Sequence, residues 1–212
     1  MRIGITGGIA TGKSRVTQLL RERGSFTFSA DEAARAELGH NSTTLQQVVN
    51  RFGTEILQDD NSLNRKKLGE IIFQDGRARS DLERITHPGI ARLLRAQITA
   101  VESDYPDTSV FVEVPLLFEA KLENFFEIIV VVAASEEVQR HRLVNRDGIA
   151  SEDASRRIKA QMPISSKVSL ADYVVRNDTT ENDLRKNVDF LFSWIMEKES
   201  QVVRRISIRQ VY

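Results

Sequence analysis

Gly7-Gly8-Ile9-Ala10-Thr11-Gly12-Lys13-Ser14 decides the fold, because it matches the phosphate-binding loop pattern G-x-x-x-x-G-K-S/T counted from Gly7. Residues 2–6 before it are predicted to form a short buried strand. Residues 14–20 after it carry apolar side chains at helical spacing and are predicted to begin a helix. Strand, loop and helix in this order form the setting that the motif requires, so we expect an α/β fold.

The residues of this loop have separate predicted tasks. Glycines let consecutive backbone N–H groups turn inward and form a concavity for an anion, and the helix N-terminus adds partial positive charge there. Lys13 is predicted to reach the β- and γ-phosphates of a nucleotide, and the Ser14 hydroxyl to ligate Mg²⁺. A glycine-rich turn with an exposed lysine is the alternative, and the position, spacing and flanking pattern argue against it.

Composition narrows the class of protein. The chain has 212 residues, enough for one domain or for one domain with a sizeable insertion. Thirty basic and thirty acidic residues cancel, so no basic field points to nucleic acid as a partner. The absence of cysteine excludes disulfides, thiolate metal sites and a cysteine nucleophile. No apolar run reaches the roughly 18 residues that span a bilayer, so we expect a cytoplasmic protein without a membrane partner.

A single aspartate follows the second predicted strand. Residues 25–29 read as this strand, and Asp31 comes just after its end. Ligands of open parallel sheets lie beyond the carboxyl ends of the strands, which places Asp31 on the side of the phosphate loop. Asp31 also suits the N-cap of a helix over residues 32–36, and the pattern alone leaves both roles open.

Residues 43–101 are almost wholly helical in pattern, which suits a helical subdomain inserted between the second and third strands. Pro88 is predicted to open a further helix within this stretch. The basic residues of the stretch form either a solvated face or a site for an anionic acceptor. His87 has no partner histidine nearby, so a structural or hydrogen-bonding role is favoured over metal binding.

Three further strands are predicted, at residues 109–114, 127–133 and 173–175. Glu113 stands at the end of the first of them, where nucleotide enzymes often hold Mg²⁺ directly or through water. A carboxylate with local protein partners is the rival interpretation, because such metal sites usually carry Asp.

Two arginines share one face of the helix that follows Ser135. Arg142 and Arg146 are four residues apart, and like charges at that spacing repel unless an anion lies between them. A triphosphate supplies that anion, since arginine forks match phosphate oxygens. A solvated helix face is the alternative.

Further motifs run along nearly the whole chain, from about residue 2 to residue 190. They are residues 4–14, Ala30-Asp31 with Ala34-Arg35, residues 82–88, Val114-Pro115-Leu116-Leu117-Phe118-Glu119, Gln139-x-x-Arg142-x-x-x-Arg146-Asp147, Arg157-Ile158-x-x-Gln161-Met162-Pro163, Lys167, Ala171-Asp172 and Asn177. In this order they resemble the motifs of dephospho-CoA kinases, whereas many enzymes share the phosphate loop alone.

The resemblance implies a P-loop kinase fold, a three-layer α/β/α arrangement with a central parallel sheet, in a single domain. Its core would be about residues 1–30, 105–135 and 170–212, with a helical CoA-binding part at about 36–104 and a lid at about 136–168. The implied reaction transfers the γ-phosphoryl group of ATP, with Mg²⁺, to the 3′-hydroxyl of the ribose in dephospho-CoA. This is the last step of coenzyme A synthesis. The oligomeric state stays open.

The resemblance also assigns site residues. Asp31 would be the general base, Lys13 would stabilise the transferring phosphoryl group, and Ser14 would hold Mg²⁺. Asp31, Arg35 and His87 would bind the acceptor. The implied nucleotide-binding residues are Gly7, Ala10, Thr11, Gly12, Lys13, Ser14, Arg15, Arg142, Arg146 and Asn177. Two positions depart from the family pattern: Arg15 stands where Thr is usual, and Glu113 where Asp is common.

Other classes of nucleotide-binding protein fit less well. Adenylate-kinase-like enzymes carry Gly-x-Pro-Arg at the acceptor site, but none of the four prolines here precedes an arginine. The Asn-Lys-x-Asp motif of regulatory GTPases is absent. Intact Lys13, Ser14 and Asp31 argue against a scaffold with a relic phosphate loop.

Overall fold

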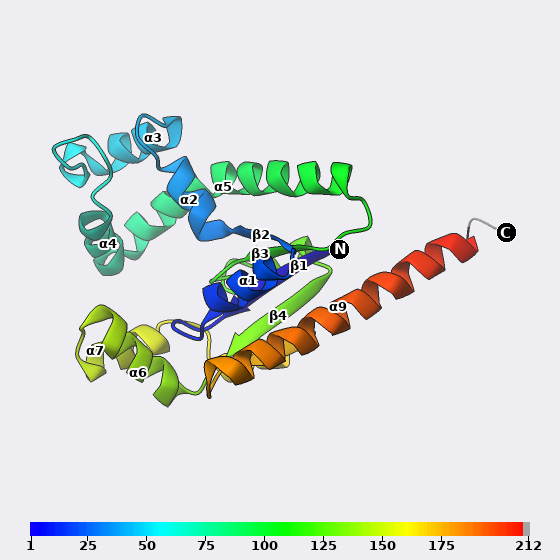
Figure 1. The fold of residues 1–212 in the computed structure, drawn as a ribbon. Helices are drawn as coiled ribbons and strands as arrows, with labels where there is room; N and C mark the ends of the chain where they lie inside the picture. The colour runs from blue at the N-terminus through cyan, green and yellow to red at the C-terminus, as the bar shows by residue number, and fades with distance from the viewer. Residues whose placement is uncertain (210–212) are drawn as a thin grey trace. The chain divides into compact units, whose positions relative to one another are not determined.

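The structure, a computed structural model that describes residues 1–209, is built on a five-stranded parallel sheet (Figure 1). The strand order is β2-β3-β1-β4-β5, so β1 is central, with β3 on one side and β4 on the other. The strands are β1 (Arg2–Gly7), β2 (Phe26–Ser29), β3 (Val110–Glu113), β4 (Ile128–Ala133) and β5 (Tyr173–Arg176). The predicted α/β fold with a central parallel sheet flanked by helices is confirmed.

Burial explains the composition of the strands. Every residue of β3 and β4 is buried, as expected for parallel strands covered on both faces. On one face, β1 and β4 pack against α1 (Lys13–Glu22) and α9 (Glu181–Arg209). The buried residues of this cluster include Ile3, Ile5, Val16, Leu19, Leu20, Val130, Val132, Leu184, Val188, Leu191 and Ile195.

The other face of β1 requires a glycine. A Cβ atom at Gly4 would lie 2.7 Å from Leu117 and 2.9 Å from Phe126. Both residues come from the segment between β3 and β4, which contains the 3-10 helix η2 (Glu123–Phe125). The close approach of this segment fixes the central strand, and with it the loop that follows β1.

The chain divides into two compact units. The core unit is Met1–Ser29 with the chain from Val101 onward, and the helical unit is Ala30–Ala100. The core unit also holds α6 (Glu136–Asp147), α7 (Ser151–Lys159) and α8 (Ile164–Ser169). Helices α6 and α7 pack side by side (Figure 1), within the residues predicted to form the lid.

The helical unit has a hydrophobic core of its own. Its elements are α2 (Ala30–Glu37), α3 (Thr43–Phe52), the 3-10 helix η1 (Thr54–Ile56), α4 (Arg65–Gln74) and most of α5 (Gly76–Asp104). The buried residues are Leu38, Leu45, Val48, Phe52, Ile56, Leu63, Leu68 and Ala78. Side chains cap two of these helices: Ser42 Oγ accepts from Leu45 N at 3.0 Å, and Asn64 Oδ1 from Lys67 N at 3.0 Å.

The expectation that Pro88 opens a further helix is wrong. Pro88 lies inside α5, whose axis bends in Figure 1, as a proline without an N–H normally requires. Contacts with α2 hold the helix just past the proline: Glu37 packs closely against Gly89 and pairs with Arg92 at 3.5 Å. Tertiary packing therefore overrides the local break.

Within residues 1–209, no helix combines the length and the apolar character that a membrane crossing requires.

Candidate active site

Backbone geometry in the phosphate loop requires glycine at two positions. Gly12, the N-cap of α1, has φ 94° and ψ 24°, in the left-handed region that side chains disfavour. A Cβ atom there would collide with the Asn177 side chain. Gly7 has φ 154°, and a Cβ atom there would collide with the Val132 carbonyl oxygen of the neighbouring strand. Gly7 and Gly12 of the motif are therefore needed because a side chain would strain the backbone and would collide with neighbouring atoms.

Lys13 lies on the loop itself. It is the first residue of α1, and its side chain is largely buried. Its Nζ donates to the Gly8 carbonyl at 2.9 Å and to the Gly7 carbonyl at 3.3 Å. The ammonium group is thus held beside the concavity in which the motif places phosphate.

Ser14 forms a hydrogen bond with Glu113, the residue for which the sequence left both a metal-binding and a local structural role open. Its Oγ donates to Glu113 Oε1 at 2.8 Å, and Thr17 Oγ1 lies 3.2 Å from Glu113 Oε2. The register pairs Ile5 of β1 with Glu113, which places this buried carboxylate beside the loop. Mg²⁺ binds oxygen ligands, and a hydroxyl and a carboxylate both supply them, so this pair of residues fits the metal. The described side chains, in residues 1–72 and 74–201, include no cluster of three His, Cys, Asp or Glu residues suited to a metal.

Arg142 and Asn177 meet the loop from two different elements. The Arg142 Nη1 donates to the carbonyls of Ala10 and Thr11, both at 3.4 Å. Asn177, just after β5, donates from Nδ2 to the Thr11 carbonyl at 2.8 Å and accepts from Arg142 Nη2 at 3.3 Å. Four of the predicted nucleotide-binding residues therefore converge at one place.

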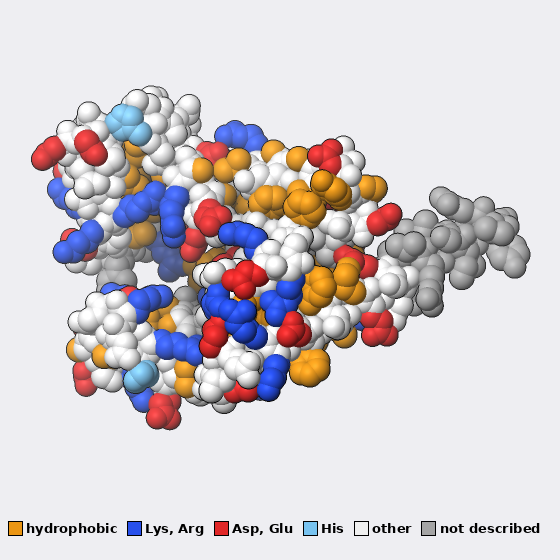
Figure 2. Space-filling view, in the orientation of Figure 1, with side chains coloured by type: hydrophobic (Ala, Val, Ile, Leu, Met, Phe, Trp, Pro, Cys, Tyr) orange, Lys and Arg blue, Asp and Glu red, His pale blue; other side chains and the backbone are white. Residues whose placement is uncertain are grey.

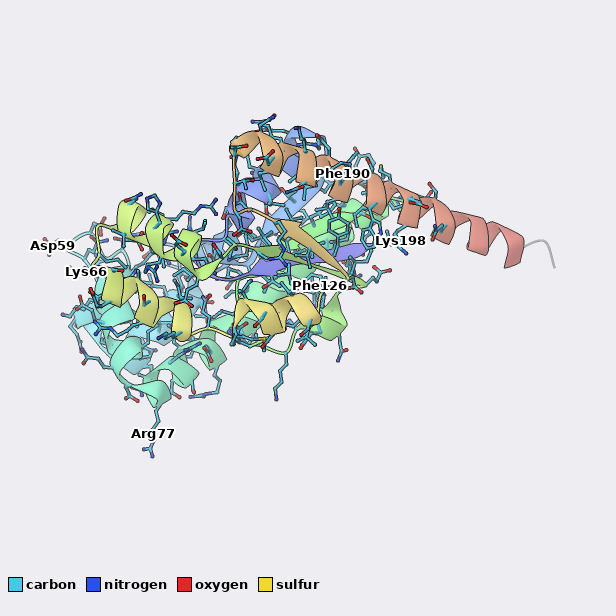
Figure 3. All side chains as sticks on the ribbon, turned by 90° about the horizontal axis from the view of Figure 1, so that it is seen from below. Asp59, Lys66, Arg77, Phe126, Phe190 and Lys198 are labelled. Atoms are coloured by element: carbon cyan, nitrogen blue, oxygen red, sulfur yellow. The ribbon has the colours of Figure 1, made fainter. Side chains whose placement is uncertain are left out.

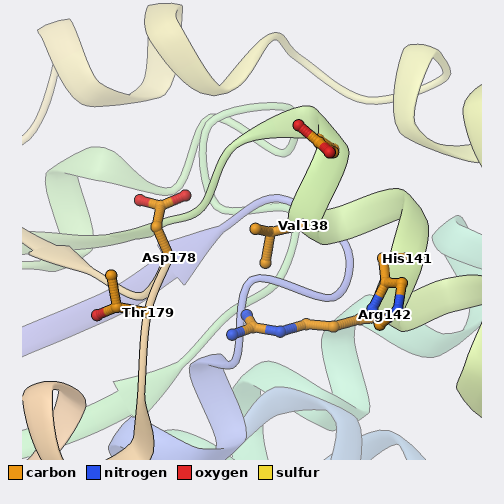
Figure 4. Close-up of a pocket in the computed structure, with 6 residues that line it drawn as sticks. Val138, His141, Arg142, Asp178 and Thr179 are labelled. Carbon is orange, nitrogen blue, oxygen red and sulfur yellow. The ribbon is translucent and has the colours of Figure 1, made fainter.

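A pocket of about 320 Å³ opens beside this cluster (Figure 4). Arg142 extends along it in the close-up, with Val138 above and Thr179 on the other side. Its lining residues are Glu137, Val138, His141, Arg142, Asp178 and Thr179. The pocket thus combines a flat cationic group with apolar and hydrogen-bonding side chains.

The side chains of Arg15 and Arg146 are directed to carboxylates. Arg15 pairs with Glu181 of α9, and the hydrogen bond between them raises the pKa of the Arg15 guanidinium. Arg146 Nε donates to Asp147 Oδ1 at 2.7 Å, a bond that raises the pKa of Arg146. Asp147 also pairs with Arg157 at 3.0 Å. The Arg146 side chain is 61% exposed, so its predicted nucleotide contact requires a change of partner.

The predicted acceptor residues lie in the helical unit. Asp31 is in the first turn of α2, one residue inside the helix, so it is not the N-cap. Asp31 and Arg35 are both exposed, and their spacing of four places them on one helix face. His87 is exposed on α5, next to Pro88. Among the side chains that the structure describes, in residues 1–72 and 74–201, none is a hydrogen-bond or ion-pair partner of these three.

Basic and acidic side chains are mixed on one face of the molecule. Figure 2 shows Lys and Arg interspersed with Asp and Glu over the visible face, in keeping with equal numbers of basic and acidic residues. In the helical unit, Lys66 and Arg77 are exposed, and Arg77 points outward from the ribbon (Figure 3). Exposure alone does not separate a solvated face from an acceptor site, so both interpretations of these basic residues stay predictions.

Several polar residues with no individual role in the sequence prediction form contacts at the loop or close to it in the chain's fold. Gln161 Oε1 accepts from the Ile9 backbone N–H at 2.8 Å. Lys167 of α8 is fully buried and pairs with Glu119 at 2.8 Å. Partial burial acts to raise the pKa of Glu119, but hydrogen bonds from Lys167 and nearby backbone groups outweigh it and leave the pKa lowered. Their only sequence signal was membership of the quoted motifs.

Comparisons with known proteins agree with this geometry. The sequence model of the dephospho-CoA kinase family matches residues 1–183. The dephospho-CoA kinase of Syntrophotalea carbinolica is 42% identical over 186 residues, which cover 88% of each chain. That of Anaeromyxobacter dehalogenans is 41% identical over 191 residues, covering 90% of each chain.

Solved structures give the same picture. TT1252 from Thermus thermophilus has a TM-score of 0.76 and 31% identity, over 91% of this chain and 96% of that one. A dephospho-CoA kinase from Campylobacter jejuni has a TM-score of 0.70 and 29% identity, over 93% and 98%. A shikimate kinase from Acinetobacter baumannii shares the fold alone, with a TM-score of 0.51 and 15% identity over 93% of each chain. By sequence and structure, this chain belongs to the dephospho-CoA kinase family.

Proposed function

We propose that this protein transfers the γ-phosphoryl group of ATP to the 3′-hydroxyl of the ribose in dephospho-CoA, the reaction that completes coenzyme A synthesis. One observation carries the proposal: an intact phosphate loop with Lys13 and Ser14 in place, in a chain that matches the dephospho-CoA kinase family over residues 1–183. The likeness to shikimate kinase concerns the fold only and suggests no second acceptor.

The nucleotide is proposed to bind in the core unit. Loop amides and the N-terminus of α1 would hold the phosphates, and Lys13 would exchange two backbone carbonyls for β- and γ-phosphate oxygens. The pocket beside Arg142 would take the base, because a guanidinium plane stacks well on an aromatic ring. Arg146 would leave Asp147 to join the phosphates when the lid closes.

Mg²⁺ would enter as part of the ATP complex. Ser14 and Glu113 would hold it, directly or through water, since their oxygens already lie 2.8 Å apart. The ion neutralises charge on the β- and γ-phosphate oxygens. Glu113 has a second task whether or not it touches the metal, because it orients the Ser14 hydroxyl and also lies against Thr17.

The acceptor is proposed to bind through the helical unit. Asp31 would accept the proton of the ribose 3′-hydroxyl as that oxygen attacks the γ-phosphorus, and ADP would leave. Arg35, on the same helix face, is placed to pair with an anionic group of the acceptor. His87 would supply a further hydrogen bond.

A panel of acceptors tests the proposal. The purified protein would be incubated with Mg·ATP and, in separate reactions, dephospho-CoA, AMP, shikimate and gluconate. Mass spectrometry and phosphorus NMR should find one added phosphate on dephospho-CoA alone, at the ribose 3′ position, and none in the Lys13→Ala protein. Phosphorylation of another acceptor while dephospho-CoA stays unmodified would contradict the proposal.

A further inference from the structure

We infer that Gln161 is a positioning residue of the phosphate loop, whose side-chain carbonyl holds the Ile9 amide until a phosphate oxygen of ATP takes its place. The inference rests on the proposed nucleotide site. It adds an exchange of partners at one loop amide, which couples loading of the loop to the segment that carries Gln161.

The first support is the contact itself. Ile9 lies in the middle of the phosphate loop, and its N–H donates to Gln161 Oε1 at 2.8 Å. Amides of such a loop cradle phosphate oxygens through the same N–H groups. One N–H makes one good hydrogen bond, so the glutamine carbonyl and a phosphate oxygen compete for it. With no phosphate, the carbonyl supplies the hydrogen-bond acceptor that this amide requires.

Gln139 also lies beside the phosphate loop, and its burial differs from that of Gln161. Gln139 of α6 is 2% exposed and donates from Nε2 to the Ala134 carbonyl at 2.9 Å. Its Oε1 lies so close to Gly8 that a Cβ atom there would come within 2.6 Å. Gln161 is only partly buried, and its side-chain carbonyl accepts from the Ile9 amide. Burial therefore locks Gln139 in place, whereas solvent can receive the Gln161 side chain when it leaves.

The residue after Gln161 is anchored through contacts that do not involve Ile9. Met162 N donates to Glu119 Oε1 at 3.1 Å, and the fully buried Lys167 lies 2.8 Å from the same oxygen. Lys167 also donates to the Pro115 carbonyl at 3.4 Å, to which Thr6, just before the loop, donates at 3.3 Å.

This anchor limits what moves. Since Met162 N is bonded to Glu119, release of the Ile9 amide moves the Gln161 side chain and leaves Met162, α8 and the sheet in place. In the nucleotide-free protein the Gln161 side chain should therefore occupy the Ile9 amide, and ATP should displace that side chain before the predicted lid closes.

Two substitutions at Gln161 separate this role from a merely structural one. Gln161→Ala removes the competing carbonyl and adds no charge. Gln161→Glu keeps a stronger, charged acceptor for the Ile9 amide and repels the phosphates. Gln47→Glu, on the exposed surface of α3, is the matched charge control. ATP affinity would be measured by calorimetry, and amide exchange of Ile9 and residues 151–161 by NMR with and without a non-hydrolysable ATP analogue.

The two variants should differ in ATP affinity. Gln161→Glu should weaken ATP binding about tenfold or more, a loss of about 1.4 kcal/mol, while Gln161→Ala and Gln47→Glu should not weaken it. In Gln161→Ala, exchange of the Ile9 amide should rise about tenfold without nucleotide and match the wild type with the analogue.

Three results would overturn the inference. Equal weakening of ATP binding by Ala and Glu at position 161 would show a structural role, and so would exchange rates raised to the same extent with and without the analogue. Unchanged exchange in nucleotide-free Gln161→Ala would remove the Ile9 contact. A wild-type protein that does not bind ATP at all would instead refute the proposed nucleotide site, and the inference with it.

Discussion

Two groups of proposed site residues differ in how far protein contacts hold their side chains. One group is proposed to bind the nucleotide and the other the acceptor. In the core unit, Lys13 and Ser14 each have partners inside the site, on loop carbonyls and on Glu113. In the helical unit, Asp31 and Arg35 are exposed on α2, which buries only Ala33. If the proposed sites are correct, ATP meets side chains that protein contacts already hold near the loop, whereas the acceptor meets side chains that solvent surrounds.

The physical cause lies in the supporting elements. The phosphate loop joins a strand buried in the middle of a parallel sheet to a helix packed on that sheet, so its backbone is held from both ends. Helix α2 is eight residues long, and isolated helices of that length are marginal in water. Substitutions on the two sides should therefore have separable effects on binding and on turnover.

The largest effect is expected at Asp31. Asp31→Asn should lower kcat by about two to four orders of magnitude, because the amide cannot take the proton of the ribose hydroxyl. ATP affinity should stay within about twofold, since the nucleotide residues belong to the other unit. Kinetics at saturating substrates and calorimetry with ATP measure the two quantities. Asp59→Asn is the control, because Asp59 is exposed in the same unit. A near-normal rate in Asp31→Asn would show that Asp31 is not the general base.

Lys13→Ala should give the next largest effect, a fall of about two to three orders of magnitude in kcat. The amine that the loop carbonyls hold is the one proposed to stabilise the transferring phosphoryl group. Lys186→Ala, on the exposed surface of α9, should leave the rate unchanged. Retained activity in Lys13→Ala would contradict the assignment of the loop.

A smaller effect is expected at Arg142. Arg142→Ala removes contacts to Ala10, Thr11 and Asn177 and one wall of the pocket, and should raise the KM for ATP about tenfold. The KM for dephospho-CoA should change little. Arg140→Ala, on the same helix, is the matched control. If neither the KM for ATP nor kcat moves in Arg142→Ala, the lid and base-pocket assignments fail.

The smallest effect should appear in the pH dependence of stability. Glu119 has a lowered pKa in the folded protein, so its charge stabilises the fold above its ordinary value of 4.5. That contribution is lost as the pH falls through the lowered folded pKa. Urea unfolding of the wild type and Glu119→Gln between about pH 7 and pH 3 should give a stability difference that shrinks on acidification. A difference that is constant with pH would show that Glu119 acts through packing alone.

Local pattern predicted much of the core unit. The loop with its flanking strand and helix, and the apolar run Ile128–Ala133, carry their signals within a few residues, and the structure has both. The family and the fold class were also predicted correctly from motifs in series.

The long-range contacts of the site could not be predicted from the sequence, because no local pattern encodes them. Ser14 and Glu113 are 99 residues apart, and Lys167 and Glu119 are 48 apart, so only the folded chain pairs them. Pro88 was misjudged for the same reason, since contacts between α2 and α5 sustain a helix that local propensity would end. The roles of Asp31, Arg35 and His87 remain predictions.

The decisive measurement is a structure of the protein with dephospho-CoA and a non-hydrolysable ATP analogue. We expect the phosphates to lie on the loop amides, with an Asp31 carboxylate oxygen about 2.6–3.2 Å from the ribose 3′-oxygen. A closed complex in which the Asp31 side chain faces solvent, with a different group beside the 3′-oxygen, would contradict this expectation.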